Sequence, residues 1–271
     1  MKEETLQLDN RRIFVRSWEV ERPEANLFIA HGLGEHSGRY AHLAEHFNNL
    51  GYNVYAHDHQ GHGKSSGKQG HINDFEQYSD DLRIVIEKYS KEGLSNHLLG
   101  HSLGGVIAAG FLIRNPDIID RCIISAPGFE KKIPPNPVKA FIGKLLANIT
   151  PQLTLWNEIE AEWICRSEKI VSDYQKDPLV HDRVSAKFFT SFLAERALVE
   201  KESHTIKSPI LMILPGADLI INHKVSKDIF ALFSNEENKL VEFSDCYHEI
   251  LNEDKEKFAA YAEIGNWLAC K

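Results

Sequence analysis

Apolar residues along this chain gather in short runs that alternate with stretches of helical spacing. Residues 27–30 and 210–214 form apolar runs typical of strands buried on both faces of a sheet, and further strands are indicated at 52–56 and 122–125. In the stretches between and after these runs, apolar residues recur at helical spacing over 40–50, 75–89, 106–113, 225–233 and 255–269. This alternation predicts a mostly parallel sheet covered by helices on both faces.

The rhythm changes near the N-terminus and again after residue 128. Alternating segments at 5–8 and 13–20 are joined at Asp9-Asn10, which predicts a β-hairpin. From about 130 to 200, prolines separate helical patterns and no strand is evident. We therefore expect a single domain over residues 1–271, with a helical cap inserted at 130–200.

One helix of this insertion has a strongly apolar face. The residues that recur at helical spacing are Val138, Phe141, Ile142, Leu145, Leu146 and Ile149. We favour the interpretation that this face packs as core against the rest of the insertion. The alternative is a surface through which acyl substrates enter from a bilayer, so a transient membrane-surface contact through the cap stays open.

Composition and charge exclude some classes of protein. The chain has 271 residues, 42% hydrophobic and 26% charged, as in ordinary globular proteins, and its net charge of −8 argues against a nucleic-acid binder. The N-terminus lacks the apolar segment of a signal peptide, and no run approaches the roughly 18 apolar residues of a membrane span. Scattered cysteines without a Cys-x-x-Cys pair indicate reduced thiols in a cytoplasmic protein. They are Cys122, Cys165, Cys246 and Cys270.

The segment 96–105 carries the strongest chemical signal. Gly100, Ser102 and Gly104 form the pattern Gly-x-Ser-x-Gly, preceded by an apolar strand end and followed by a helical pattern. A nucleophilic serine must stand clear of the backbone on a sharp strand-to-helix turn, where strand and helix approach closely. Glycines two positions to either side remove the side chains that would collide there. We therefore predict that Ser102 is a nucleophile.

A serine hydroxyl is a weak nucleophile and needs a base, which is itself oriented by a carboxylate. The sharp turn that carries the serine is called a nucleophile elbow. In hydrolases with such an elbow, the acid and then the base follow the serine along the chain. Asp218 follows the strand predicted at 210–214, and His248 follows the last predicted strand at 240–243. We therefore predict a catalytic triad of Ser102, Asp218 and His248.

The oxyanion formed in such an attack needs backbone N–H donors. One is expected from the residue after the nucleophile, which is Leu103, and a second from a loop after an early strand. The glycine-rich loop His31-Gly32-Leu33-Gly34 ends such a strand. We assign the N–H groups of Leu33 and Leu103 as the oxyanion hole.

Several segments resemble the monoglyceride lipase and lysophospholipase branch of the α/β-hydrolases. The segment 31–40 is similar to the oxyanion segment of that branch, and 58–65 to its Asp-x-x-Gly-His-Gly-x-Ser loop. The elbow, a cap motif at 174–179, and the acid and base segments at 216–218 and 247–249 are similar as well. The match spans nearly the whole chain.

This resemblance implies an α/β-hydrolase fold, with a mostly parallel eight-stranded sheet flanked by helices and a helical cap over a deep acyl pocket. It also implies that the alcohol half of the substrate lies near Glu35, Arg39 and Tyr174. Leu251 stands where monoglyceride lipases often carry a second histidine that touches the glycerol. The implied activity is that of a monoacylglycerol lipase, with a lysophospholipase second and a short-chain carboxylesterase third. This chemistry needs no cofactor.

Two other interpretations fit the sequence less well. The run His57-Asp58-His59-Gln60-Gly61-His62 approaches the metal-binding cluster of binuclear metallohydrolases, but Gly61 stands where that cluster has a carboxylate. Asp58, Gly61 and Gly63 are better explained as residues that shape a turn. A non-catalytic binding protein of the same fold would be expected to have lost a member of the triad, and none is lost.

Overall fold

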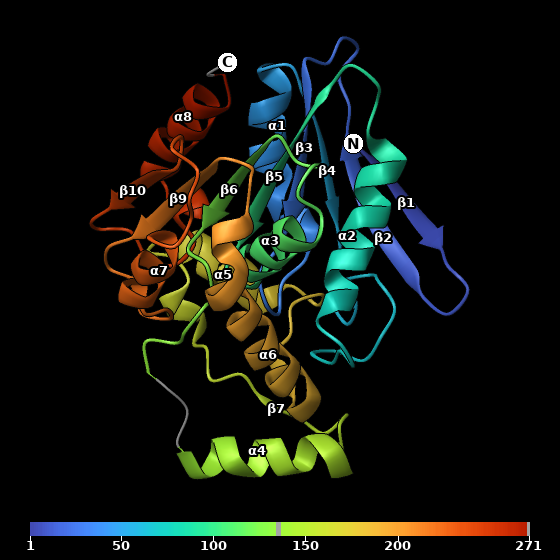
Figure 1. Ribbon diagram of the computed structural model, residues 1–271, viewed down its shortest axis with the longest axis vertical. Coiled ribbons are helices and arrows are strands. Elements are labelled where there is room, and N and C mark those ends of the chain that lie inside the picture. The colour runs from blue at the N-terminus through green and yellow to red at the C-terminus, as the bar shows by residue number, and fades with distance from the viewer. Residues whose placement is uncertain (134–136, 270–271) are drawn as a thin grey trace.

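The computed structural model describes residues 1–133 and 137–269, and its central feature is an eight-stranded sheet (Figure 1). The strands of this sheet are β1 (Lys2–Gln7), β2 (Arg12–Trp18), β3 (Ala25–Ala30), β4 (Tyr52–His57), β5 (Ser95–His101), β6 (Arg121–Ser125), β9 (Ile210–Pro215) and β10 (Lys239–Phe243). They lie in the order β1-β2-β4-β3-β5-β6-β9-β10. β1 and β2 form the predicted hairpin, β2 is antiparallel to β4, and the other neighbouring pairs are parallel. The predicted eight-stranded, mostly parallel sheet is confirmed.

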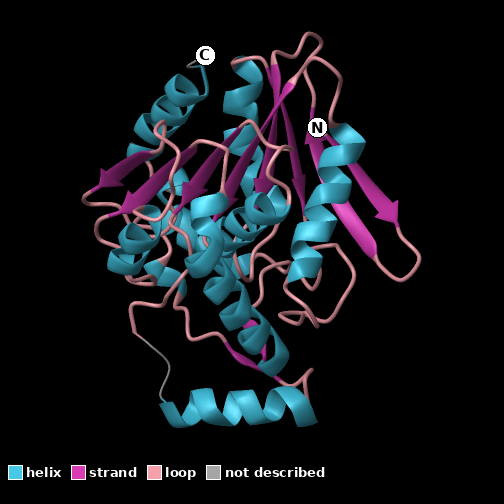
Figure 2. Cartoon of the chain, viewed as in Figure 1, coloured by secondary structure: helices cyan, strands magenta, loops and turns pink. Residues whose placement is uncertain are grey.

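Helices cover both faces of this sheet (Figure 2). The helices that flank it are α1 (Ala41–Asn49), α2 (Glu76–Tyr89), α3 (Leu103–Arg114), α7 (His223–Phe230) and α8 (Glu256–Ala269), and short 3-10 turns are η1 (Ser37–Tyr40), η3 (Ser203–Thr205) and η4 (Ile250–Asn252). Side chains alternate along a strand, so β3 serves both layers. Leu27 packs with α1 and α8 on one face, and Phe28 packs with α2 and α3 on the other. This explains why residues 27–30 of β3 form a continuous apolar run.

A row of three asparagines, of which Asn26 and Asn53 are buried, joins β4, β3 and β5 near the start of each strand. Asn26 of β3 lies opposite Asn53 of β4 and Asn96 of β5. Asn26 donates to the Asn96 side chain at 2.9 Å, and Asn53 donates to Asn26 at 3.1 Å. A shift in register would leave these amides unpaired in the core, so the row helps to hold β3 and β5 in register. These two strands lead into the glycine-rich loop and the serine elbow.

Between β6 and β9 the chain leaves the sheet. The elements of this inserted segment are α4 (Pro137–Ile149), β7 (Thr154–Trp156), η2 (Ala161–Trp163), α5 (Glu168–Lys176), β8 (Arg183–Ser185) and α6 (Ala186–Glu202). β7 and β8 form a small antiparallel sheet, where the sequence indicated no strand. Each has three residues, which is too short for alternation to stand out from a helical pattern.

The apolar face of α4 is exposed, so our preferred interpretation of that face as core is wrong. Phe141 is 70% exposed, Leu145 54% and Ile149 66%. The helix packs on α6 through its opposite side, where Ala147 is buried. The side chain of Val138 lies outside the described part of the chain, as do Cys270 and Lys271. Among the helices of the described residues, none is long and apolar enough to cross a bilayer.

Candidate active site

Ser102 lies on a strained turn between β5 and α3. Its φ of 52° and ψ of −114° place a non-glycine residue in a region that L-residues rarely adopt. A Cβ on Gly104 would collide with the carbonyl oxygen of Ala30, and one on Gly100 would collide with the carbonyl oxygen of Gly104. Glycine is therefore required at both positions for strand and helix to approach.

The three residues of the predicted triad lie within hydrogen-bonding distance of one another. His248 Nε2 is 2.8 Å from Ser102 Oγ, and His248 Nδ1 is 2.8 Å from Asp218 Oδ2. Asp218 follows β9, and its other carboxylate oxygen accepts the N–H groups of Ile220 and Ile221 at 2.6 and 3.0 Å. These bonds hold the carboxylate against the imidazole, which suits proton transfer from the serine hydroxyl to His248.

Electrostatics favour a charged Asp218 and a basic His248. Burial by itself would raise the pKa of Asp218, but His248 and two backbone N–H donors outweigh it, and the pKa is lowered. Burial would lower the pKa of His248, but Asp218, with Glu249 and Glu35 at greater distance, raises it above its ordinary value. The imidazole is thereby a better proton acceptor than an isolated histidine.

The predicted oxyanion donors belong to the residue after the nucleophile and to the loop after β3. Leu103 is the first residue of α3, where a helix leaves its N–H groups without an intrahelical acceptor. Leu33 follows β3 and lines the same cavity as Ser102. The N–H of Gly32 donates to Glu35 Oε1 at 2.6 Å and is therefore occupied.

Glu35, Arg39 and Tyr174 come together, but they contact one another rather than an open subsite. Glu35 accepts from the Tyr40 hydroxyl at 2.7 Å and from Arg39 at 2.7 Å. The Arg39 guanidinium also lies over the Tyr174 ring, 4.8 Å from its centre. Of the three predicted substrate-binding residues, Glu35 and Tyr174 line the cavity over Ser102.

Glu249 completes this network, and the sequence analysis missed it. Its two carboxylate oxygens accept from Arg39 at 2.6 and 2.7 Å, and one of them accepts from Asn252 at 2.7 Å. Burial would raise the pKa of Glu249, but Arg39 lowers it, so the carboxylate is charged. The one signal in the sequence was its position directly after His248. An acidic residue buried beside a catalytic base needs a cationic partner, so this position could have pointed to an ion pair.

His101, directly before the nucleophile, also lines the cavity. Its ring is buried and lies 5.0 Å from the His248 ring, and among the described residues its Nδ1 has no hydrogen-bond partner. Burial and the neighbouring His248 lower the pKa of His101 to about 4, so the ring is neutral near pH 7.

The cavity over Ser102 is small. Its volume is about 30 Å³, which gives room for a few water molecules at most. Ile159, Ile164 and Tyr174 of the inserted segment line it from above. Among the described residues, the space over Ser102 is therefore much smaller than the deep acyl pocket that we expected.

The insertion is bonded to the oxyanion segment on one side of this cavity. Asp177 lies 2.8 Å from His36 Nε2, and the N–H of His181 donates to the carbonyl of Gly34 at 2.9 Å. Movement of the insertion away from Ser102 must therefore break contacts with the loop that carries Leu33, or move that loop as well.

The histidines around residue 59 are buried and bonded to each other and to the backbone. His59 Nδ1 lies 3.1 Å from His57 Nε2, and its Nε2 lies 3.0 Å from the carbonyl of His31. Asp58 accepts from the N–H groups of Ser37 and Lys64 at 2.8 and 2.7 Å, as expected for a residue that shapes the turn. Within residues 1–133 and 137–269, no three His, Cys, Asp or Glu side chains converge as metal ligands would.

Comparison with known proteins agrees with this fold. A family model described as serine aminopeptidase, S33, matches residues 21–255, and the chain therefore belongs to this family of α/β-hydrolases. A monoglyceride lipase homolog of Monkeypox virus is 33% identical, over 96% of this chain and 95% of its own. Phospholipase YtpA of Bacillus subtilis is 31% identical, over 88% of this chain and 92% of its own.

Among solved structures, a monoacylglycerol lipase of Paleococcus ferrophilus superposes with a TM-score of 0.87 and 34% identity. The alignment covers 94% of this chain and 98% of that one. The predicted fold class and the resemblance to the monoglyceride lipase branch are thereby confirmed.

Proposed function

We propose that this protein is a serine carboxylic-ester hydrolase that cleaves single-chain lipids, and that its main substrate class is monoacylglycerol, cleaved to a fatty acid and glycerol. The observation that carries the proposal is the hydrogen-bonded chain from Ser102 through His248 to Asp218, with both links at 2.8 Å. The relatives described as monoglyceride lipases and a monoacylglycerol lipase support the substrate class.

In the proposed reaction Ser102 Oγ attacks the ester carbonyl while its proton passes to His248 Nε2. The N–H groups of Leu33 and Leu103 hold the oxyanion of the tetrahedral intermediate. The imidazolium then gives its proton to the departing glycerol oxygen, which leaves an acyl-enzyme. Water attacks that ester with His248 again as base, and the serine regains its proton as the fatty acid departs.

The charge near the cavity supports an ester substrate whose alcohol half is uncharged. Glu35 and Glu249 share one guanidinium, that of Arg39, so this group carries one excess negative charge. A phosphate-bearing head group would be repelled there, whereas glycerol hydroxyls could donate to carboxylate oxygens. We therefore place a monoacylglycerol before a lysophospholipid, which is the second candidate because of the likeness to a phospholipase. A short-chain carboxylesterase is the third.

We also propose that residues 130–200 act as a cap that opens to admit substrate. The cavity of about 30 Å³ cannot hold an acyl chain while Ile159, Ile164 and Tyr174 stay in place. The exposed apolar face of α4 supports entry of substrate from a lipid phase, and hence a peripheral contact with membranes. The scattered cysteines, free in the described part of the chain, support the cytoplasmic location predicted from the sequence.

Turnover on a panel of esters tests this proposal. Wild-type protein and Ser102→Ala are assayed on 1-monooleoylglycerol, lysophosphatidylcholine and p-nitrophenyl acetate, and both are treated with a fluorophosphonate probe. We expect the highest kcat/KM on the monoacylglycerol, labelling of the wild type alone, and a loss on the order of 10⁴-fold or more in kcat for the variant. Near-wild-type turnover by a folded Ser102→Ala would contradict the nucleophile assignment, and preference for the lysophospholipid would contradict the substrate class.

A further inference from the structure

The base loop, residues 244–249, carries His248 and leaves the sheet at its edge. β10 is the last strand in the order of the sheet, and Ser244 and Asp245, directly after it, are exposed. His248 must be held at 2.8 Å from Ser102, and a displacement of about 1 Å in an active site can cost on the order of 100-fold in rate. The contacts that hold the base loop therefore bear on the rate of the reaction.

The backbone N–H groups on either side of His248 are both bonded to partners outside the base loop. The N–H of Tyr247 donates to Glu253 Oε1 at 3.0 Å, and the N–H of Glu249 donates to the carbonyl oxygen of Ile164 at 2.7 Å. Glu253 follows the 3-10 turn η4, whereas Ile164 belongs to the insertion and lines the cavity over Ser102. One flank of the base is thus held by a side chain, and the other by the backbone of the insertion.

Glu253 also binds the same part of the insertion. Its Oε1 accepts from the N–H of Arg166 at 3.4 Å, and its Oε2 accepts from Arg166 Nε at 3.1 Å. The Glu253 side chain is only 2% exposed, so its charge depends on these donors rather than on water. Hydrogen bonds to a charged group are stronger than those between neutral groups. A single buried carboxylate therefore ties the backbone beside His248 to residues 164–166 of the insertion.

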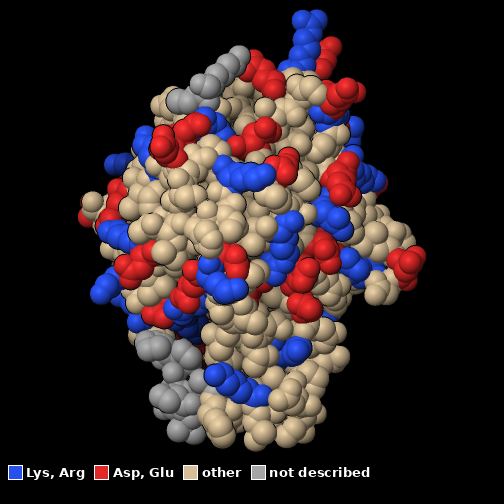
Figure 3. All heavy atoms as spheres, in the orientation of Figure 1, with Lys and Arg blue, Asp and Glu red and all other residues tan. Residues whose placement is uncertain are grey.

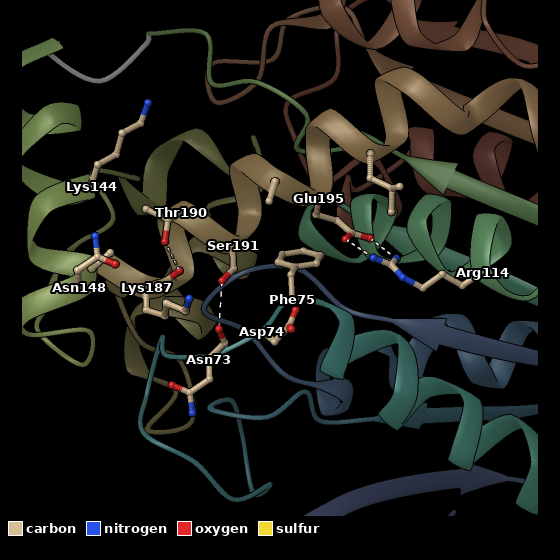
Figure 4. A pocket seen from close by; sticks show the side chains of 13 residues that line it. Asn73, Asp74, Phe75, Arg114, Lys144, Asn148, Lys187, Thr190, Ser191 and Glu195 are labelled. Carbon is tan, nitrogen blue, oxygen red and sulfur yellow. Dashed lines mark hydrogen bonds and ion pairs between the residues drawn. The ribbon is translucent and has the colours of Figure 1, made fainter.

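The outer helix of the insertion is attached differently. Figure 1 places α4 at the end of the molecule, away from β10, and a cavity of about 700 Å³ lies between α4, α6 and residues 73–75 (Figure 4). On the face shown in Figure 3, this end carries mostly uncharged side chains, so ion pairs on that face contribute little to its attachment. By contrast, Ile164, Cys165 and Ser167 are buried. Residues 164–167 are therefore the part of the insertion that is seated against the base loop.

We propose that Glu253 is a positioning residue, and that through it the base His248 is aligned with Ser102 only while residues 164–166 of the insertion are seated against the base loop. This rests on the proposed function, which assigns His248 as the base. Because Glu253 bonds to the backbone of the base loop, it acts through His248, and hence on bond cleavage rather than on binding of the ester. A movement of the insertion that keeps the enzyme active must leave residues 164–166 in place.

Kinetics of Glu253→Gln test the proposal with p-nitrophenyl acetate, a small soluble ester. This change keeps the size of the side chain but removes the charge that binds Arg166 and the N–H of Tyr247. We expect kcat to fall by between about ten- and 100-fold. We expect KM to stay within about twofold of the wild type, because the lost contact acts on the transition state and not on ester binding. The rate of labelling by a fluorophosphonate probe should fall with kcat, since that reaction also needs the base.

Glu256→Gln is the matched control. Glu256 also binds the Arg166 guanidinium, at 2.9 Å, but among the described residues it has no hydrogen bond to the base loop. It is more than a third exposed, and such surface ion pairs contribute little, so kcat should stay within about twofold of the wild type. Wild-type kcat in folded Glu253→Gln, or an equal loss of kcat in Glu256→Gln, would overturn the proposal.

A second variant tests whether the insertion takes part. Arg166→Gln removes the insertion's side of the contact at a side chain that is 35% exposed, so this protein should fold even if Glu253→Gln does not. We expect kcat to fall by at least roughly threefold, again with little change in KM. The double variant of both residues should lose no more than Glu253→Gln alone, because both changes break one contact. A loss equal to the product of the two single losses would overturn the coupling between the insertion and the base.

Stability is measured on the same proteins. Urea unfolding shows the conditions in which each variant is fully folded, and the assays are run there, so a lower kcat cannot come from unfolded protein. A residue that only stabilised the fold would leave kcat and the labelling rate of the folded protein at their wild-type values, and that result would overturn the positioning role.

The outcomes for this proposal and for the proposed function are separate. A protein that is inactive on 1-monooleoylglycerol, but whose turnover of p-nitrophenyl acetate depends on Glu253, would contradict the substrate class alone. A protein that hydrolyses 1-monooleoylglycerol through Ser102 with full kcat after Glu253→Gln would contradict the positioning role alone.

Discussion

Glu249 binds both terminal nitrogens of Arg39, at 2.6 and 2.7 Å, from the position directly after His248. Arg39 reaches Glu35 at 2.7 Å with one of these nitrogens, and Glu35 accepts the N–H of Gly32 at 2.6 Å. A continuous set of charge-assisted hydrogen bonds therefore joins the loop of the proposed base to the loop of a proposed oxyanion donor. Such bonds are shorter and stronger than neutral ones, so the two loops hold each other in place.

Glu249→Gln removes one negative charge from this network and keeps the shape of the side chain. Because Glu249 helps to raise the pKa of His248, we expect the acid limb of kcat/KM to shift to lower pH. We also expect the preference for a neutral ester over lysophosphatidylglycerol to fall by up to about tenfold, as repulsion of the phosphate weakens. Parallel pH profiles and substrate ratios for wild type and variant measure both effects. Unchanged values of both would show that Glu249 only stabilises the fold.

The pH dependence of the wild type follows from the proton transfer assigned to His248. Its pKa is raised above the ordinary value of about 6.5, and only the neutral imidazole can accept the Ser102 proton. We expect kcat/KM for a soluble p-nitrophenyl ester to be constant in mild alkali and to fall tenfold per pH unit on the acid side, from near or slightly above neutral pH. A profile that stays flat down to pH about 5 would contradict His248 as the base.

Acid should also destabilise the fold, for a separate reason. Burial lowers the pKa of four neighbouring histidines: to about 4 for His57, to about 3 for His62, and well below the ordinary value for His31 and His59. The unfolded chain binds protons at these sites as pH falls below about 6.5, whereas the folded chain does not, so stability falls with pH in that range. Each group contributes up to about 1.4 kcal/mol per pH unit between its two pKa values.

Urea unfolding at a series of pH values checks this expectation. His57→Gln cannot titrate and should flatten the slope of the free energy of unfolding against pH, even if it lowers stability at neutral pH. His204→Gln, at an exposed site in η3 outside this cluster, is the matched control for a histidine substitution. A wild-type free energy of unfolding that does not change between about pH 7 and 5 would contradict the prediction.

Local chemistry made much of the fold and of the candidate site predictable. Some strands of the parallel sheet, such as β9, are apolar runs, and the elbow needs glycine at 100 and 104 for steric reasons. Asp218 and His248 could be singled out because each follows a predicted strand in the expected chain order. In each case the signal lies within a few residues of the feature that it predicts.

The features that were missed depend on contacts between distant parts of the chain. Glu249 pairs with Arg39, which lies 210 positions away in the sequence. The asparagine row joins three strands, but asparagine is also common in loops, so these residues gave no signal in the sequence. The apolar periodicity of α4 shows that one face is apolar, but only packing shows that small residues face α6 and large ones face outward. Periodicity cannot tell a core face from a binding face.

The elbow allows a test in which two physical effects have opposite signs. Gly104 lies in the first turn of α3, and helix propensity alone predicts that Gly104→Ala stabilises by up to about 1 kcal/mol. The structure predicts the opposite, because the new Cβ would collide with the backbone carbonyl of Ala30, which cannot move aside as a flexible side chain could. Separating β3 from α3 to relieve the clash would also move the loop of Leu33 away from Ser102. We therefore expect a loss of about 3 kcal/mol or more in the free energy of unfolding, together with a loss of kcat.

Gly128→Ala is the matched control for this test. Its Cβ would lie 3.4 Å from the carbonyl carbon of Ser102, which is an ordinary van der Waals contact beside the same nucleophile. We expect that variant to remain within about 0.5 kcal/mol of the wild type in stability. Urea unfolding and turnover of a soluble ester measure both variants. If Gly104→Ala were as stable and as active as Gly128→Ala, the close approach of β3 to α3 would not be what requires glycine at position 104.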